Sequence, residues 1–222
     1  MSKIIFDIET AGVDFDSLDE ASKEYFLKYA DNPQKIDEVK NSMSFFPVTA
    51  EIITIGMLEV ETNRSFVFFQ NGGVKEKFQE GDATYVAGDE KEILAHFWKL
   101  IEKATVFVTF NGRVFDCPFI MLRSAMHKVR ASKNLMPYRY DPKLHVDLCD
   151  QLTFYDAMRR KFSLAMWCKA FAIPSPKEGG ITGLQVKEFY QKGAYKDIAR
   201  YCARDLQATK ELYLYWENYL RF

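Results

Sequence analysis

Ile4-Ile5-Phe6-Asp7-Ile8-Glu9-Thr10 decides the fold, because this stretch sets two acidic side chains inside an otherwise apolar strand. Side chains alternate across a strand, so Asp7 and Glu9 project from the same face, about 7 Å apart along the backbone. The apolar residues around them are typical of a strand buried on both faces, where an unpaired charge is costly and two like charges repel. A bound cation would remove that conflict. The alternative is a strand end at which both acids simply reach solvent.

The spacing alone does not decide between these two interpretations. Four other pairs of acids separated by one residue occur in the chain, in polar or helical stretches or at the end of a strand. Only the pair of Asp7 and Glu9 is embedded in an apolar run. A short motif of this kind therefore needs support from elsewhere in the sequence.

The composition indicates one soluble domain. With 222 residues, 48% of them hydrophobic and 15% aromatic, the chain is long enough to bury a large core, and no Pro/Ser-rich linker divides it. The amino-terminal segment has no signal-peptide pattern, and no apolar run approaches the roughly 20 residues that span a bilayer. The four cysteines are widely spaced and lack a CxxC pair, which favours reduced thiols in the core. We therefore expect a cytoplasmic protein, without a membrane segment, that forms a single domain over residues 1–222.

The charges are unevenly distributed along the chain. The net charge of −1 gives no overall attraction to nucleic acid. Residues 120–161 carry nine bases and four acids, an excess that indicates either a phosphate-binding face or an ordinary solvated surface. Residues 11–50 carry eight acids and four lysines, and 16–43 have the pattern of a polar helix with weak apolar periodicity. We interpret the stretch at about 11–50 as a polar helical insertion rather than part of the core framework.

The remaining pattern predicts strands and helices in an order typical of an α/β fold. Residues 52–58 and 65–69 flank a turn, which indicates a hairpin after the first strand. A capping box at Asp89 and Glu92 predicts the start of an amphipathic helix. Further strands are expected at 105–110 and 145–148. Further helices are expected with Pro118 in the first turn and an end at about Met126, from Leu164 onward, and from about Tyr195 to Tyr219, with a loop at 174–180. This order predicts a mixed sheet.

Two more acids and a tyrosine stand at positions where they could act together. Asp116 lies just past the buried strand, and its ordinary role would be a helix N-cap, which Pro118 two residues later supports. A cap near the edge of a central sheet can still present a carboxylate to a cleft. In the last helix Tyr201 and Asp205 are i and i+4, and therefore share one face.

Three segments, taken together, resemble a known family. The strand FDIET at 6–10, the segment TFNGRVFDCP at 109–118 and the helix YCARDLQAT at 201–209 resemble, in order and separation, the three exonuclease motifs of the DEDDy 3'-5' exonucleases. They are most similar to the proofreading exonuclease domain of family B DNA polymerases and its stand-alone bacterial relatives. The resemblance extends from about Lys3 to Trp216, and includes HVDL and the stretch FSLAMWCKAFAIP.

The resemblance implies a ribonuclease H-like fold, in which a mixed β-sheet is flanked by helices, and a site for two divalent cations, Mg²⁺ or Mn²⁺. By motif, Asp7 would bridge the two ions. Glu9 and Asp205 would complete the first metal site, and Asp116 would hold the second ion, largely through water. Tyr201 would orient the attacking water.

Two features distinguish this chain within the resemblance. Arg200 stands five residues before Asp205, where the related histidine subgroup carries its His, so the tyrosine subgroup is favoured. The polar insertion at about 11–50 departs from the family pattern. The chain also leaves no room for a polymerase domain, so we expect no proofreading role within it.

The chemistry of phosphodiester cleavage agrees with these residue types. Negative charge builds on the phosphate and on the leaving 3'-oxygen, and two divalent cations about 4 Å apart stabilise it. Such hard cations prefer oxygen ligands, so neither Cys nor His is expected in the site. Tyrosine, with a pKa near 10, is a poor base at neutral pH, so Tyr201 is expected to position water. Residues expected to contact substrate border the motifs: Thr10, Asn111, Arg113 and Phe115, the last of which is as well explained as ordinary core.

The sequence therefore predicts a metal-dependent exonuclease that hydrolyses phosphodiester bonds from the 3' end of single-stranded DNA. An exoribonuclease of the same fold is one alternative, because this chemistry requires neither sugar. A catalytically idle nucleic-acid-binding domain is the other, which the complete set of four acids and a tyrosine disfavours. Four carboxylates repel nucleic acid, so we expect a basic run to flank the incoming strand: Lys128, Arg130, Lys133, Arg139 and Lys143.

Overall fold

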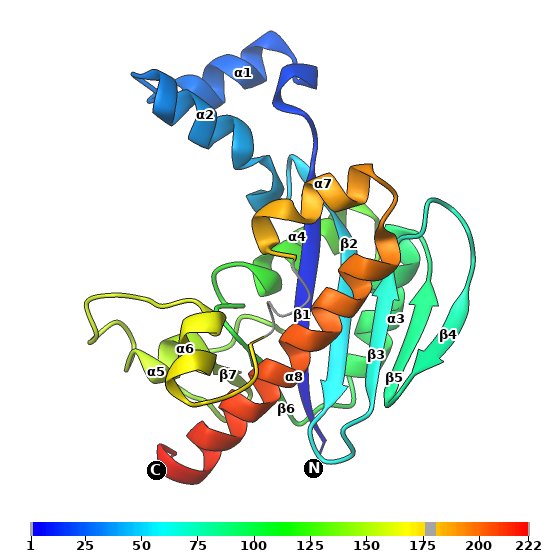
Figure 1. Cartoon of the computed structure of the whole chain (residues 1–222), viewed down its shortest axis with the longest axis vertical. Coiled ribbons are helices and arrows are strands. Elements are labelled where there is room, and N and C mark those ends of the chain that lie inside the picture. The colour runs from blue at the N-terminus through cyan, green and yellow to red at the C-terminus, as the bar shows by residue number, and fades with distance from the viewer. Residues whose placement is uncertain (1, 176–180, 222) are drawn as a thin grey trace.

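The structure is a computed structural model that describes residues 2–175 and 181–221. Within these residues seven strands form one mixed sheet with the order β4-β5-β3-β2-β1-β6-β7 (Figure 1). The strands are β1 (Lys3–Gly12), β2 (Ala50–Glu59), β3 (Ser65–Phe69), β4 (Lys77–Glu80), β5 (Ala83–Ala87), β6 (Val106–Thr109) and β7 (His145–Asp147). The predicted α/β class with a mixed sheet is confirmed.

β1 is the central strand. It pairs antiparallel with β2 along its length and parallel with β6 near its amino end only. Phe6 and Ile8 belong to the core cluster on one face of the sheet, and Ile5 belongs to the cluster on the opposite face. Because side chains alternate, Asp7 and Glu9 share the face of Ile5.

Helices cover both faces of the sheet (Figure 1). On the face of Phe6 lie α3 (Glu90–Ile101) and α4 (Asp116–Met126). On the other face lie α5 (Leu148–Leu152), α6 (Leu164–Ala170), α7 (Val186–Gln191) and α8 (Tyr195–Tyr219), with the short 3₁₀ helix η4 (Gly183–Gln185) before α7. α8 crosses β1, β2 and β3, so one face of this helix meets the face of the sheet that carries Asp7 and Glu9. No described helix combines the length and apolar character needed to cross a membrane.

Residues 13–49 form a helical arm that projects from the body of the molecule (Figure 1). The arm contains η1 (Phe15–Ser17), α1 (Glu20–Leu27), α2 (Pro33–Asn41) and η2 (Met43–Phe45). Asp19 and Asn32 cap α1 and α2 with their side chains, and no residue of either helix is buried. The helices of the arm fall within the range of about 11–50 that the sequence predicts to be a polar helical insertion, between the end of β1 and the start of β2.

Most other predicted elements lie where they were expected. β2 and β3 form the hairpin, and the capping box of Asp89 and Glu92 begins α3. The strands β4 and β5 were not predicted, because β4 is exposed and its four residues lack an apolar alternation. Pro118 lies in the first turn of α4, as predicted, and the helix begins at Asp116 after an N-cap at Phe115. Of the loop expected at 174–180, residues 176–180 lie outside the described residues.

Gly56 lets α8 approach the sheet closely. It lies in β2 directly opposite Asp7. A Cβ atom at this position would lie 2.6 Å from Cys202 Sγ and 2.8 Å from Leu206 Cδ1, both on α8 and both in fully buried residues. The neighbouring residue on α8 is Asp205, so the absence of a side chain at position 56 brings this carboxylate to the sheet.

We expect Gly56→Ala to lower the free energy of unfolding by about 1 to 3 kcal/mol, because the added methyl group overpacks a buried contact. Urea denaturation measures the change. Gly183→Ala is the matched control, since no atom lies within 4 Å of the Cβ position there. Equal stabilities of the two variants would contradict the close approach of α8.

Candidate active site

Three carboxylates from two elements meet on one face of the sheet. Asp7 and Glu9 extend from β1, and Asp205 extends from α8. Each offers an oxygen, and these oxygens all lie within 4.8 Å of one another. The period of two in a strand and the close approach of α8 together produce this arrangement. A hard divalent cation prefers such a set of oxygen ligands.

The strand is irregular beside this cluster. The pairing of β1 with β2 shifts between Glu9 and Thr10, where Glu9 faces Thr54 and Thr10 faces Ile52, so that Ile53 is an extra residue in β2. A bulge of this kind bends the strand and re-aims the neighbouring side chains, and bulges are common next to active sites.

Asp116 reaches the same region from the opposite face of the sheet. β6 pairs with β1 only as far as Ile5, so the N–H of Ile8 has no strand partner. That N–H donates to Asp116 Oδ1 at 3.0 Å. The sequence left open a helix N-cap for Asp116, and the structure excludes it, because Phe115 is the cap residue of α4. The buried carboxylate completes the edge of β1 instead.

The carboxylates raise one another's pKa values. For Asp7 the pKa is raised well above its usual range by burial first, and then by the charges of Asp116, Glu9 and Asp205. For Glu9 the pKa is also raised well above its usual range, by burial and then by Asp205 and Asp116. Burial raises the pKa of Asp116 to about 7. Among residues 2–175 and 181–221, no Lys or Arg forms an ion pair with Asp7, Glu9 or Asp116. No cationic side chain of the described residues therefore offsets the charge that these three acids carry when they ionise.

Tyr201 lies against the same cluster, one helical turn before Asp205. It is buried, and its side chain makes a hydrogen bond with Asp205. Burial, followed by the charges of Glu9, Asp205 and Asp7, raises the pKa of Tyr201 far above its ordinary value. The phenol is therefore protonated at neutral pH and has no capacity to act as a base. The guanidinium of Arg204 lies over its ring, 5.9 Å from the centroid.

The turn before Asp116 is held by a residue that sequence reasoning did not single out. Asp147, at the end of β7, accepts hydrogen bonds from the backbone N–H groups of Asn111, Arg113 and Cys149 at 2.8 to 3.0 Å. Asn111 adopts φ 61°. HVDL contains Asp147, but nothing in the sequence shows that the turn after β6 would fold onto it. Its role follows from the parallel pairing of β6 and β7.

Two of the four residues expected to contact substrate, Thr10 and Arg113, use polar groups of their side chains to bind other parts of the protein. Thr10 is buried and donates its hydroxyl to the carbonyl of Ser44 at 2.7 Å. Arg113 donates to the carbonyl of Pro137 at 2.9 Å and lies 3.8 Å from Asp150. Both side chains thus already bind groups of the protein itself, and their contact with substrate stays a prediction.

The other two residues expected to contact substrate, Phe115 and Asn111, are half-buried. Phe115 is half-buried, packs against the core cluster, and has its ring 6.4 Å from the exposed ring of Phe45. It thus remains compatible with both interpretations made from the sequence. Asn111 is half-buried in the turn that precedes Asp116. We keep these two residues as predicted substrate contacts.

The basic run expected to flank the substrate does not lie beside the cluster as a unit. Lys133 donates to the carbonyl of Ala104, at the amino end of β6, whereas Asp116 follows the carboxyl end. Lys128 and Arg130 come after α4, so about 16 Å of helix separates them from Asp116. α4 therefore carries Lys128 and Arg130 away from the cluster.

The remaining members of the basic run also do not form a free phosphate track. Arg139 pairs with Asp150 at 2.6 Å and with Asp156 at 2.7 Å, so these acids offset its charge. Lys143 is exposed and lies 4.0 Å from Asp141.

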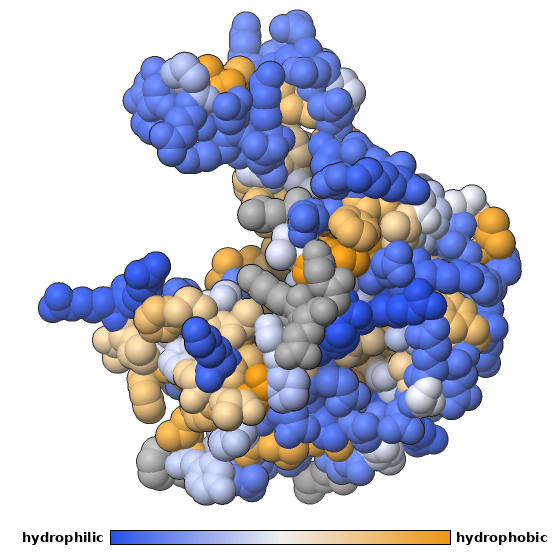
Figure 2. Space-filling model, viewed as in Figure 1, coloured by the Kyte–Doolittle hydropathy of each residue, from blue (hydrophilic) through white to orange (hydrophobic). Residues whose placement is uncertain are grey.

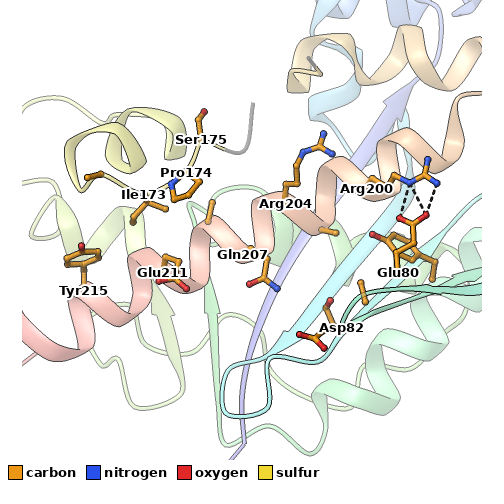
Figure 3. A pocket seen from close by; sticks show the side chains of 16 residues that line it. Glu80, Asp82, Ile173, Pro174, Ser175, Arg200, Arg204, Gln207, Glu211 and Tyr215 are labelled. Carbon is orange, nitrogen blue, oxygen red and sulfur yellow. Dashed lines mark hydrogen bonds and ion pairs between the residues drawn. The ribbon is translucent and has the colours of Figure 1, made fainter. Parts of the chain in front are cut away.

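A groove of about 790 Å³ runs along the outward side of α8 and is separate from the carboxylate cluster (Figure 3). Arg204, Gln207 and Glu211 project into it from α8, and Arg200 pairs with Glu80 at one end. In the part of the chain that the structure describes, its lining includes none of the four clustered acids.

The comparisons with known proteins agree with this geometry. Residues 45–220 match the family described as a predicted 3'-5' exonuclease related to the exonuclease domain of PolB, so the chain belongs to this family. The fold is similar to the structure of the family B DNA polymerase from the hyperthermophilic archaeon Pyrobaculum calidifontis, with a TM-score of 0.63 and 15% identity over 98% of this chain. This chain spans 24% of the length of that polymerase chain. A comparison with curated proteins found no match.

The ribonuclease H-like fold is therefore confirmed, and the family to which the chain belongs is one described as a predicted 3'-5' exonuclease. The family match includes Asp116, Tyr201 and Asp205, but it begins after β1. Asp7 and Glu9 thus join the site through the geometry of the cluster rather than through the family match.

We expect the stability of the metal-free protein to fall as the pH rises. A carboxyl group whose pKa is raised in the folded state binds its proton more tightly there, so its favourable contribution is present below its ordinary pKa and is lost as the pH passes the folded value. For Asp116 this window runs from about 4 to about 7. Calorimetry in EDTA should give a lower melting temperature at pH 8 than at pH 5.

Asp116→Asn should reduce the loss of stability between pH 4 and 7, because the amide does not titrate and can still accept from Ile8. Asp19→Asn is the control: it retains an N-cap on the exposed arm, and the pKa of Asp19 is lowered rather than raised, chiefly by the N–H of Ser22. An unchanged pH dependence in Asp116→Asn would contradict the assigned shift.

Proposed function

We propose that this protein is a 3'-5' exonuclease of the DEDDy type that hydrolyses phosphodiester bonds from the 3' end of single-stranded DNA with two divalent cations. The observation that supports this most directly is the meeting of Asp7, Glu9 and Asp205 within 4.8 Å, with Asp116 held on the neighbouring edge of β1. The family match supplies the reaction class.

The residues present fit a pair of hard cations. All donors are carboxylate oxygens, and the raised pKa values of Asp7 and Glu9 show that the cluster favours added positive charge. Asp7, Glu9 and Asp205 would hold the first ion. Asp116 would hold the second with Asp7, since its Oδ1 already accepts from Ile8 and one oxygen remains. When bound, the ions would stabilise the negative charge on the attacking and leaving oxygens.

Tyr201 acts by position rather than as a base. Its hydroxyl stays protonated because the surrounding carboxylates and burial disfavour the phenolate. A protonated phenol next to Asp205 can donate one hydrogen bond and accept another, so it can hold a water in line for attack on the terminal phosphodiester.

Single-stranded RNA is the alternative substrate, because the phosphodiester group that would be cleaved is common to DNA and RNA. A catalytically idle binding domain is the other alternative. To distinguish both alternatives from the proposed function, the purified protein is incubated with 5'-labelled single-stranded DNA and RNA, with and without Mn²⁺, and the products are resolved on a sequencing gel. A ladder that shortens from the 3' end on DNA supports the proposal, and the absence of cleavage on both substrates contradicts it.

We expect Asp7→Ala and Asp205→Ala each to lose several orders of magnitude in cleavage rate while remaining folded. Removing one carboxylate also removes repulsion, so both variants should melt at or above the wild-type temperature in EDTA. Asp37→Ala, an exposed acid of α2, is the control and should retain full activity. Wild-type cleavage by either cluster variant in Mg²⁺ would exclude the assigned metal site.

Tyr201→Phe should lose a smaller factor, about tenfold to a thousandfold in kcat, because it removes only the water-positioning hydroxyl. Titration calorimetry should show Mn²⁺ affinity close to wild type. Loss of Mn²⁺ binding would show that the hydroxyl belongs to the metal site and that the positioning role is wrong.

A further inference from the structure

Large aromatic side chains are exposed in two segments on the side of the sheet formed by β7. Tyr138 and Tyr140 precede β7, and their exposed fractions are 73% and 55%. Phe154 follows α5 and is 57% exposed. The rings of Tyr138 and Tyr140 lie 5.6 Å apart, and that of Tyr140 lies 4.9 Å from Tyr155, next to Phe154 in the chain. We call the surface of these four residues the aromatic platform.

Two arginines follow Phe154 and Tyr155 in the same loop, and their charges are uncompensated. Arg159 and Arg160 are exposed, and neither forms an ion pair with any residue in the described ranges. Arg160 lies over the ring of Phe162 at 5.7 Å. The nearest acid in sequence, Asp156, is already paired with Arg139 and Lys161. The local charge of the loop is therefore positive.

The backbone that carries Phe154 is strained and held in place. Phe154, Tyr155 and Asp156 have φ values of 48°, 54° and 70°, a left-handed conformation in three successive residues that are not glycine. The N–H of Tyr155 donates to the carbonyl of Asp150 at 2.8 Å, and Arg139 binds Asp156. Such strain persists where the surroundings over-determine it, and it collects at functional sites.

The aromatic platform is tied to the turn that leads to Asp116. Arg113 donates to the carbonyl of Pro137, the residue before Tyr138. Arg113 and Arg139 both approach Asp150, so the two segments share one buried acid. Figure 1 shows the loop between α5 and α6 projecting from the body, and Figure 2 shows a hollow between this lobe and the helical arm.

We infer that the aromatic platform, with Arg159 and Arg160, binds the single strand of nucleic acid upstream of the 3' end that enters the carboxylate cluster. Unstacked bases stack on exposed aromatic rings without regard to sequence, and arginines pair with the phosphates between them. Paired bases in a duplex do not offer their faces in this way, so the surface favours single strands. The direction of the bound strand, with its 3' end at the carboxylate cluster, rests on the proposed function. Binding of the strand to the platform itself requires no hydrolysis.

The test measures binding in the full chain with cleavage prevented by Asp7→Asn and EDTA. Fluorescence anisotropy with a labelled single-stranded 15-mer of DNA or RNA is read across a salt series. Tyr138→Ala should weaken binding by about fivefold to a hundredfold, as expected for loss of one stacked base. Arg159→Gln with Arg160→Gln should reduce the slope of log affinity against log salt by up to about 1.4, the value for two phosphate contacts on a single strand.

Lys128→Gln with Arg130→Gln is the matched control, because it removes the same charge from exposed residues beyond α4. Circular dichroism and melting temperature check that each variant is folded. In the active chain with Mg²⁺, the platform variants should raise KM for the 15-mer and leave kcat unchanged.

The outcomes separate this inference from the proposed function. Platform-dependent binding without any hydrolysis in Mg²⁺ would support the surface while contradicting the exonuclease. Hydrolysis with wild-type affinity and salt slope in both platform variants would overturn the surface alone. An equal loss in the Lys128/Arg130 control would also overturn it, since the effect would then come from net charge. Binding of a protein or of duplex DNA in preference to single strands would assign the platform to another partner.

Discussion

Mutual repulsion of four carboxylates is the constraint around which this fold is arranged. Asp7, Glu9, Asp116 and Asp205 come from three elements. Beside burial, the charges of the other three raise the pKa of Asp7, and the charges of Asp205 and Asp116 raise the pKa of Glu9. A flexible surface would relieve the repulsion by moving the side chains apart. Here the central strand and two packed helices hold them, so the cost is met by the apolar clusters on both faces of the sheet. Rigid scaffolding of this kind gives a cation a site whose ligands need little rearrangement.

Two backbone features convert the sheet into that scaffold. The glycine at position 56 allows α8 to lie against β2 at the level of Asp7, which brings Asp205 within reach of β1. The early end of the β1–β6 pairing leaves the N–H of Ile8 for Asp116. The first feature sets the distance between helix and sheet, and the second sets which carboxylate occupies the edge. The four acids come together only because both features are present: the missing side chain at Gly56 and the free N–H of Ile8.

The parts of the site that follow from local periodicity could be predicted from the sequence. Asp7 and Glu9 share a face because a strand has a period of two, and Tyr201 and Asp205 share a face because a helix repeats about every four residues. The fates of Arg113 and Lys133 could not be predicted, because their partners, the carbonyls of Pro137 and Ala104, are more than twenty residues away in the chain. Main-chain acceptors are present everywhere and leave no mark in the sequence.

The missed hairpin of β4 and β5 has a similar cause. β5 pairs parallel with β3, and β4 adds only an exposed outer edge, so β4 needs no apolar alternation of its own. A strand stabilised mainly by its neighbour's main chain cannot be predicted from a pattern of buried side chains.

The net charge of the chain likewise does not predict the substrate, because the charges are unevenly placed. The arm carries eight acids and four lysines, while the loop after α5 presents unpaired arginines beside exposed rings, and the two face one hollow (Figure 2). On the proposed function, a polyanionic strand would be repelled by the first surface and attracted by the second, so the placement of charges, rather than their sum, would direct it along the lobe that is anchored to Arg113.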